Sequence, residues 1–341
     1  MGTNTISQNN SKKKANTNLK FYSEILIEDS YTFLCSDNNF IVLKTIDDNL
    51  LLIYAKKDKS IISYNIISNK IINEIKNAHT SVISNFRNHL DKINKRDLIL
   101  SHALNDIKIW NIKNFECLLN INKINKDSII YSSCFLNDNN FIYILTCNCN
   151  EYNEYRENIQ VYDLNGNKIQ EINDSNENAF LIDVYYDNKY SKNYIITGNL
   201  DCVRTYDYTK NKLYHKYFDK ESGNHYSVVI DNNEKKVKLI EASENSIRIW
   251  NFHSGKLLNK IKFEYSKFLF ICLWDTNFLF ATGSDKAINL IDIKEKFIKM
   301  IGMHETSFVS NLKKIIPPQY GECLISQGNE DGKIILWKRK T

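Results

Sequence analysis

The side chains that could do chemistry in this chain are its seven histidines, its eight cysteines and one run of oxygen ligands. His304-Glu305 begins the H-E-x-x-H pattern of zinc proteases, but Phe308 stands where the second histidine must be. Cys147 and Cys149 form a C-x-C pair without the second pair that a zinc site requires. Because both sets of ligands are incomplete, the sequence predicts no metal bound by either.

Calcium and nucleotide sites fail the same test. Asp174, Asn176 and Asn178 have the initial spacing of a calcium loop, but Ala179 and Tyr185 occupy the positions of the required glycine and terminal glutamate. The chain contains no G-x-S-x-G, P-loop or G-x-G-x-x-G motif, and its ten glycines form no evident phosphate-binding loop. We therefore predict a protein that is not an enzyme, with no catalytic residues, no metal and no cofactor.

The composition predicts a folded protein that works inside the cell. Hydrophobic residues make up 43% of the 341 residues, and the net charge of +5 comes from acidic and basic residues mixed along the chain, which argues against a nucleic-acid-binding face. The cysteines lie mostly in strand-like runs, as small buried side chains do in a reducing compartment. We expect no secretory signal and no membrane insertion, a cytoplasmic rather than nuclear location, and a disordered polar leader at residues 1–18.

The elements that must position these side chains are set by an internal repeat. The runs IKIWN at 107–111, IRIWN at 247–251 and IILWK at 334–338 share one pattern, and weaker copies fill the intervals between them. The period is roughly forty to fifty residues, which is typical of one four-stranded blade per repeat. Polar and β-branched residues alternate around each anchor, as in a half-buried strand. The predicted third strands of seven blades lie near 60–65, 106–111, 159–163, 202–207, 246–251, 287–292 and 333–338.

The fullest repeats resemble those of the WD-repeat β-propeller family. Ala78-His79 stands where that family has Gly-His, and Trp110-Asn111 stands where it has Trp-Asp. The last repeat begins in the same way, at His304, and the similarity covers roughly residues 20–340. The resemblance implies an all-β fold, with residues 19–341 forming a single seven-bladed propeller of four-stranded antiparallel blades.

The resemblance also implies a buried hydrogen-bond network inside the blades. In this family a His, a Ser or Thr, an Asp and the Trp bond to one another, and a shared offset of six residues places an acidic residue before several anchors. A histidine beside an aspartate could instead belong to a catalytic triad, but a network that specifies packing needs no solvent access. The residues assigned to the network are His79, Ser101, Asp106, Trp110, Glu244, Trp250, Asp285, His304, Ser326, Asp331 and Trp337.

The two ends of the repeat predict how the ring closes. The last repeat stops after Trp337 and leaves no residues for a fourth strand, whereas residues 21–28 form a strand-like run before the first full repeat. We predict that this N-terminal strand completes the last blade, because a circular fold must cover its strand edges.

The function expected from this fold is that of a non-catalytic scaffold. The propeller would bind a protein or peptide through its loops and central opening, as a monomer within a larger complex. A ubiquitin-ligase substrate receptor is the alternative, because Lys113 stands two positions after Asn111, where some propellers of that class have a basic residue. An enzyme with a loop-built site is a third, disfavoured reading. Partner contacts are expected where the first strand of each blade begins, at Thr80, Phe180, Tyr226, Phe268 and Phe308.

Overall fold

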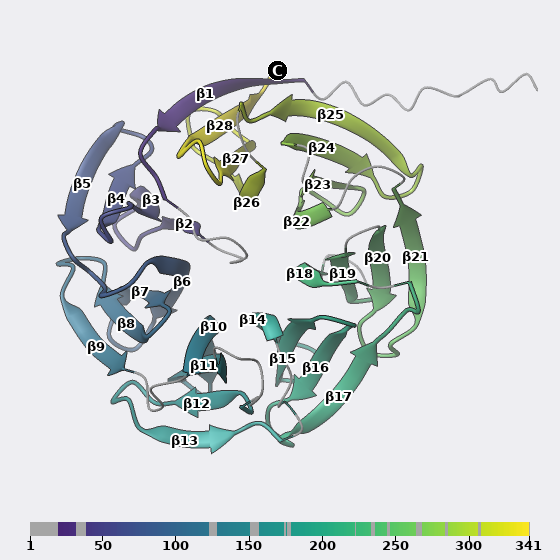
Figure 1. Ribbon diagram of the computed structural model, residues 1–341, viewed down its shortest axis with the longest axis horizontal. Coiled ribbons are helices and arrows are strands. Elements are labelled where there is room, and N and C mark those ends of the chain that lie inside the picture. The colour runs from purple at the N-terminus through teal and green to yellow at the C-terminus, as the bar shows by residue number, and fades with distance from the viewer. Residues whose placement is uncertain are drawn as a thin grey trace, which may run out of the picture.

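The chain folds as a seven-bladed β-propeller, seen in a computed structural model (Figure 1). The structure describes residues 20–31, 39–122, 128–150, 157–173, 175, 179–221, 223–232, 236–243, 246–263, 268–283, 286–305 and 308–340. Within these ranges the secondary structure is strands and turns, and seven four-stranded antiparallel sheets surround a common axis. The predicted all-β fold class is therefore confirmed, whereas the predicted leader at residues 1–18 lies outside the described residues.

Blades 1 to 6 are each built from four consecutive strands, and blade 7 is built from the last three strands and the first (Figure 1). In every blade the innermost strand lies nearest the axis and the outermost strand lies at the rim. Blade 1 contains β2 (Phe40–Lys44), β3 (Leu50–Ala55), β4 (Ile61–Asn65) and β5 (Lys70–Ile75), and blade 2 contains β6 (Ile83–Asp91), β7 (Arg96–Ala103), β8 (Asp106–Asn111) and β9 (Cys117–Asn122). Blade 3 contains β10 (Ser128–Asp138), β11 (Phe141–Asn150), β12 (Gln160–Tyr162) and β13 (Lys168–Glu171), and blade 4 contains β14 (Ala179–Asp187), β15 (Lys192–Asn199), β16 (Val203–Asp207) and β17 (Lys212–Tyr217). Blade 5 contains β18 (His225–Asp231), β19 (Lys238–Ser243), β20 (Ser246–Asn251) and β21 (Leu257–Lys262), and blade 6 contains β22 (Phe268–Leu273), β23 (Phe278–Gly283), β24 (Ala287–Asp292) and β25 (Phe297–Met303). Blade 7 contains β26 (Val309–Ile315), β27 (Cys323–Gly328), β28 (Ile334–Arg339) and the N-terminal strand β1 (Phe21–Ile27).

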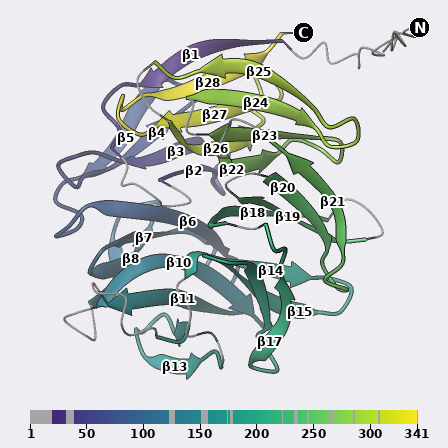
Figure 2. The ribbon, with the colours of Figure 1, turned by 45° about the vertical axis from the view of Figure 1, so that its right-hand side comes forward.

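The N-terminal strand closes the ring as predicted. β1 pairs antiparallel with β28, with Phe21 opposite Arg339 and Ile25 opposite Ile335, and Figure 2 shows the two strands side by side. The Phe21 ring also packs edge-on against the rings of Trp274 and Phe280 in blade 6, at 5.9 and 5.6 Å between centroids. The first strand of the chain thus covers the edge that the last strand would otherwise expose.

The core lies between blades rather than inside any one of them. Among the described residues, each of the seven blade junctions contains one cluster of buried apolar side chains. Close packing also fixes residue size, because a Cβ added at Gly302 on β25 would lie 2.2 Å from a ring carbon of Trp337 in blade 7. In the part of the chain that the structure describes, no helix is long and apolar enough to cross a membrane.

Candidate functional site

Blade 2 contains the complete four-residue network that the sequence assigned to it. The Nδ1 atom of His79 lies 2.8 Å from Asp106 Oδ1, and its Nε2 atom lies 2.7 Å from Ser101 Oγ. Trp110 Nε1 donates a hydrogen bond of 2.7 Å to the same hydroxyl. A single tautomer satisfies every contact, because Nδ1–H donates to Asp106 and Nε2 accepts from Ser101. The group has the order of a catalytic triad, but all four side chains are buried, so no substrate reaches it.

Blade 7 repeats this arrangement. His304 lies 3.0 Å from Asp331 Oδ2 and 2.8 Å from Ser326 Oγ, and Trp337 Nε1 donates to Ser326 at 2.8 Å. Burial lowers the pKa of His304, although hydrogen bonding to Asp331 opposes the shift. The imidazole is therefore held neutral and acts as a bridge between the loop and the strands.

In blade 5 a carboxylate stands at the strand position that Ser101 occupies in blade 2. Glu241 pairs with Arg248 across β19 and β20, just as Ser101 pairs with Lys108 across β7 and β8, so a carboxylate replaces the serine hydroxyl. Trp250 Nε1 donates to Glu241 Oε1 at 3.3 Å. The predicted members Glu244 and Asp285 lie outside the described residues.

The Arg248 guanidinium supplies the connection that the histidine makes in blade 2. It donates to Asp219 Oδ2 at 2.8 Å and to the Glu221 carbonyl at 2.8 Å, both in the loop before β18, and it lies 3.5 Å from Glu241. Hydrogen bonds from Lys260 and Arg248 hold the pKa of the Asp219 carboxyl well below its usual value. Arg248 has a side-chain exposure of 0%, so this is a buried charge held by carboxylates.

The sequence contains a signal for the role of Arg248 in blade 5. The residue two positions before the Trp is Lys108 in one IxIWN run and Arg248 in the other, and both are cations. In the structure both reach the loop that precedes the blade, because Lys108 Nζ donates to the Ala78 carbonyl at 2.6 Å. The Glu241 partner could not be recognised, because it lies on another strand.

The predicted partner-contact residues lie where the first strands begin, on the face formed by the loops that enter each blade. Thr80 is exposed, and its carbonyl accepts a hydrogen bond of 2.7 Å from Lys59 Nζ, while Phe308 is half-buried. Phe180, Tyr226 and Phe268 lie on β14, β18 and β22, but their side chains are outside the described part of the structure. We refer to this side of the disc as the entry face.

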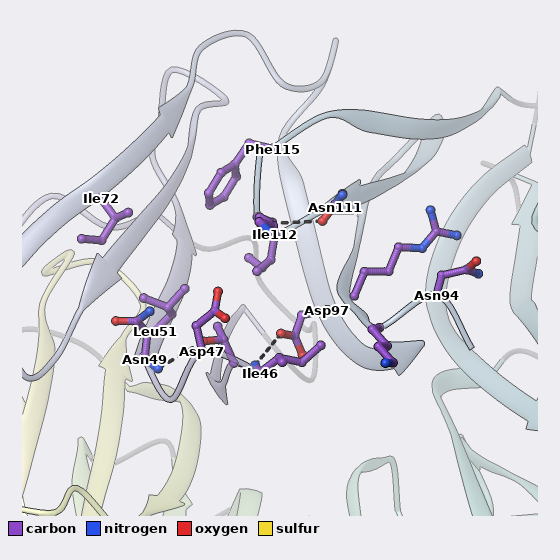
Figure 3. A pocket seen from close by; sticks show the side chains of 14 residues that line it. Ile46, Asp47, Asn49, Leu51, Ile72, Asn94, Asp97, Asn111, Ile112 and Phe115 are labelled. Carbon is purple, nitrogen blue, oxygen red and sulfur yellow. Dashed lines mark hydrogen bonds between the residues drawn. The ribbon is translucent and has the colours of Figure 1, made fainter. Parts of the chain in front are cut away.

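A groove between blades 1 and 2 lies on the opposite side, which we refer to as the groove face (Figure 3). It has a volume of about 420 Å³ and is formed by the turns β2–β3, β6–β7 and β8–β9 together with part of β5. Its lining includes Ile46, Asp47, Leu51, Ile112, Lys113 and Phe115, and we call it the blade 1–2 groove. Lys113 was singled out in the sequence by its place two residues after Asn111, but no motif marked the other residues, because they come from turns far apart in the sequence.

Hydrogen bonds from side chains to the backbone stiffen the turns around the groove. Asp97 Oδ2 accepts a hydrogen bond of 2.8 Å from the Ile46 amide and so joins the turns of the two blades. Asp91 accepts from the Asn94 amide at 3.1 Å and from Arg96 Nε at 2.9 Å. The groove is therefore a preformed feature of the fold.

Phe115 adopts an unusual backbone conformation in this groove. Its φ angle is 56°, in the left-handed region that bulky side chains rarely enter, and its amide donates to the Asn111 carbonyl at 2.7 Å. Its ring packs against the buried cluster between blades 1 and 2. The corresponding turns of other blades have a left-handed residue at the same place, namely Asn69, Gly166, Asn211, Gly255 and Lys296.

A second groove adjoins the first on the same face, between blades 2 and 3. Asn94 lines both grooves, and the second has a volume of about 480 Å³. Ile93 and Phe141, in its lining, are 64% and 66% exposed. Large apolar side chains thus project into solvent from the turns of neighbouring blades.

Comparison with known proteins leaves the family undecided. A scan against protein-family models finds no match, and a search of curated proteins finds no similar sequence. The architecture itself is a seven-bladed β-propeller closed by its N-terminal strand.

Proposed function

We propose that this protein is a non-catalytic interaction scaffold of the WD-repeat type, a rigid disc that binds a protein or peptide partner through its loops. The buried His–Ser–Asp–Trp networks of blades 2 and 7 support the WD-repeat assignment, because they join the same three parts of a blade in both. Fold alone names no partner, so the proposal depends on the surface.

The observation that carries the proposal is the exposure of large apolar residues on the groove face. Ile46 and Ile93 lie in the first turns of blades 1 and 2, Phe141 directly follows the first turn of blade 3, and the three side chains are 50%, 64% and 66% exposed. Large apolar side chains exposed on one face are typical of a protein-binding surface, since burying them against a partner removes them from water.

The six cysteines that the structure describes are free thiols, which supports a location in a reducing compartment of the cell. The proposal therefore includes an intracellular, cytoplasmic protein that acts as one propeller within a larger assembly.

Affinity purification with cross-linking and mass spectrometry tests the proposal. The wild-type protein, an Ile93→Asp/Phe141→Asp variant and a Leu200→Asp control are compared, because Leu200 is an exposed apolar residue on the entry face. We expect a partner that the wild type and the control recover and the double variant loses. Recovery of ligase adaptors would support the ubiquitin-ligase alternative. If no recovered protein depends on either face, the scaffold proposal is wrong.

A further inference from the structure

We propose that the blade 1–2 groove binds an extended peptide in which a large apolar side chain is flanked by carboxylates. This inference rests on the proposed scaffold function and specifies the chemistry of its partner. Three features of the groove support it: an apolar lining, a strained phenylalanine and unpaired lysines at the rim.

The apolar part of the groove accommodates a large side chain. In Figure 3 the Phe115 ring and Ile112 lie above Leu51 and Ile46, with Ile72 of β5 at the side. Leu51 and Ile112 are buried, whereas Ile46 and Ile72 are 50% and 54% exposed. An inserted apolar side chain would therefore contact a buried floor and remove the two isoleucines from water.

The strain at Phe115 is the second feature. The blade 5 turn has the same backbone hydrogen bond, from Gly255 to Asn251 at 3.0 Å, and uses glycine at the left-handed position. A residue with a Cβ costs about 1–2 kcal/mol more in that conformation. Among the described residues with positive φ, Phe115 is the one aromatic side chain. Strained residues concentrate at binding sites, where a side chain is needed for contact with a ligand.

The charges at the rim select the partner. Asp97 and Asp91 are occupied by the Ile46 amide and by Arg96. Lys95 and Lys113 line the groove and, among the described residues, form no ion pair within 4 Å. Two ammonium groups are therefore available to carboxylates on a bound peptide, and such charges raise the rate of association and select against basic peptides.

Asp47 is the opposing charge in the lining. The Asp47 carboxylate would repel an acidic peptide. Asp47→Asn should therefore tighten binding of that peptide, whereas Lys95→Glu and Lys113→Glu should weaken it.

Fluorescence anisotropy with labelled peptides tests the inference on the full-length protein. The probes are extended peptides with a Leu-Phe-Leu centre flanked by glutamates, by lysines or by serines, and a glutamate-flanked peptide with a serine centre. We expect the first probe to bind best, Phe115→Gly and Lys95→Glu/Lys113→Glu each to raise its Kd at least about tenfold, and salt to weaken it. Lys57→Glu, which changes an exposed lysine on the entry face, is the charge control for the single variants Lys95→Glu and Lys113→Glu and should leave the Kd unchanged.

The outcomes separate this inference from the scaffold proposal. The groove assignment is overturned if the lysine-flanked or serine-centred peptide binds as well as the first probe, if Phe115→Gly leaves the Kd unchanged, or if no peptide binds. In each case a partner still recovered through Ile93 and Phe141 would leave the scaffold proposal standing. Phe115→Gly relieves the backbone strain but also removes the ring from the cluster between blades 1 and 2, so the melting temperature of the variant is measured beside its Kd. If the variant melts well below the wild type, the Lys95→Glu/Lys113→Glu variant, which changes exposed side chains, decides the groove assignment.

Discussion

Removing the Arg248 side chain should destabilise the propeller more than removing any other charged group described above. Arg248 has a side-chain exposure of 0%, and its guanidinium contacts Asp219, Glu241 and the Glu221 carbonyl. Methionine keeps much of the volume of arginine but none of its charge. In Arg248→Met the Glu241 carboxylate, which is also fully buried, loses the guanidinium and keeps the His225 ring, whose Nδ1 atom lies 2.6 Å from Glu241 Oε2.

The expected loss follows from that burial. Breaking a buried ion pair by removing one partner costs about 3–5 kcal/mol, because the remaining charge is left in a medium of low dielectric constant. With an unfolding entropy of roughly 2 cal/mol/K per residue over a chain of 341 residues, this corresponds to a fall in melting temperature of about 4–7 °C.

The assay is thermal unfolding followed by circular dichroism, with Arg204→Met as the control. Arg204 occupies the same position in blade 4, and its side-chain exposure is 6%, but its partner Asp201 is 46% exposed and stays hydrated when the cation is removed. The control should therefore lose roughly 1 kcal/mol. Adding Glu241→Gln to Arg248→Met should recover part of the loss, since the two sites are coupled. If Arg248→Met melts within a degree of the wild type, the guanidinium does not hold blade 5 together as argued.

Three further perturbations test the closure, the packing and the buried histidine. Deleting residues 21–27 exposes the edge of β28 and should lower the melting temperature by at least about 10 °C, so an unchanged melt would contradict the closure. Gly302→Ala places a Cβ against the Trp337 ring and should cost about 1–3 kcal/mol in chemical denaturation, whereas no loss would mean that β25 moves freely. Burial lowers the pKa of His102 to about 3, so between pH 6.5 and that value the unfolded chain binds a proton that the folded chain does not. The contribution of neutral His102 to the free energy of unfolding is complete above pH 6.5 and falls by up to about 1.4 kcal/mol per pH unit as the pH drops. Urea titrations at successive pH values measure this dependence, and His102→Gln should flatten it.

Much of the fold could be predicted because a propeller repeats a local pattern. A strand alternates its side chains with a period of two residues, and the Trp110, Trp250 and Trp337 anchors show that pattern within each short run. The closure also followed from local information, since a strand was missing at one end of the repeat and present at the other.

The candidate site could be predicted only in part. The networks of blades 2 and 7 could be predicted because their residues have recognisable types at regular spacing in the sequence, as His79, Ser101 and Trp110 do. Glu241 and Arg248 have no such signal as a pair, because their contact depends on the register between β19 and β20. The partner-contact residues on the entry face were predicted from the positions where the first strands begin. The groove between blades 1 and 2 could not be predicted in this way, because its turns meet only after the blades pack.

The sequence by itself determined the strands, their number and the order in which they close the ring, because these depend on periodicity along the chain. The tertiary structure alone decided which turns lie together, which charge in blade 5 is buried and where Phe115 points its ring. Those properties depend on the packing of one blade against the next. Contacts between residues that are distant in the sequence produce no periodic pattern in the sequence. The networks around His79 and His304 therefore belong to the interior, while the blade 1–2 groove is formed mainly by residues that no motif identified.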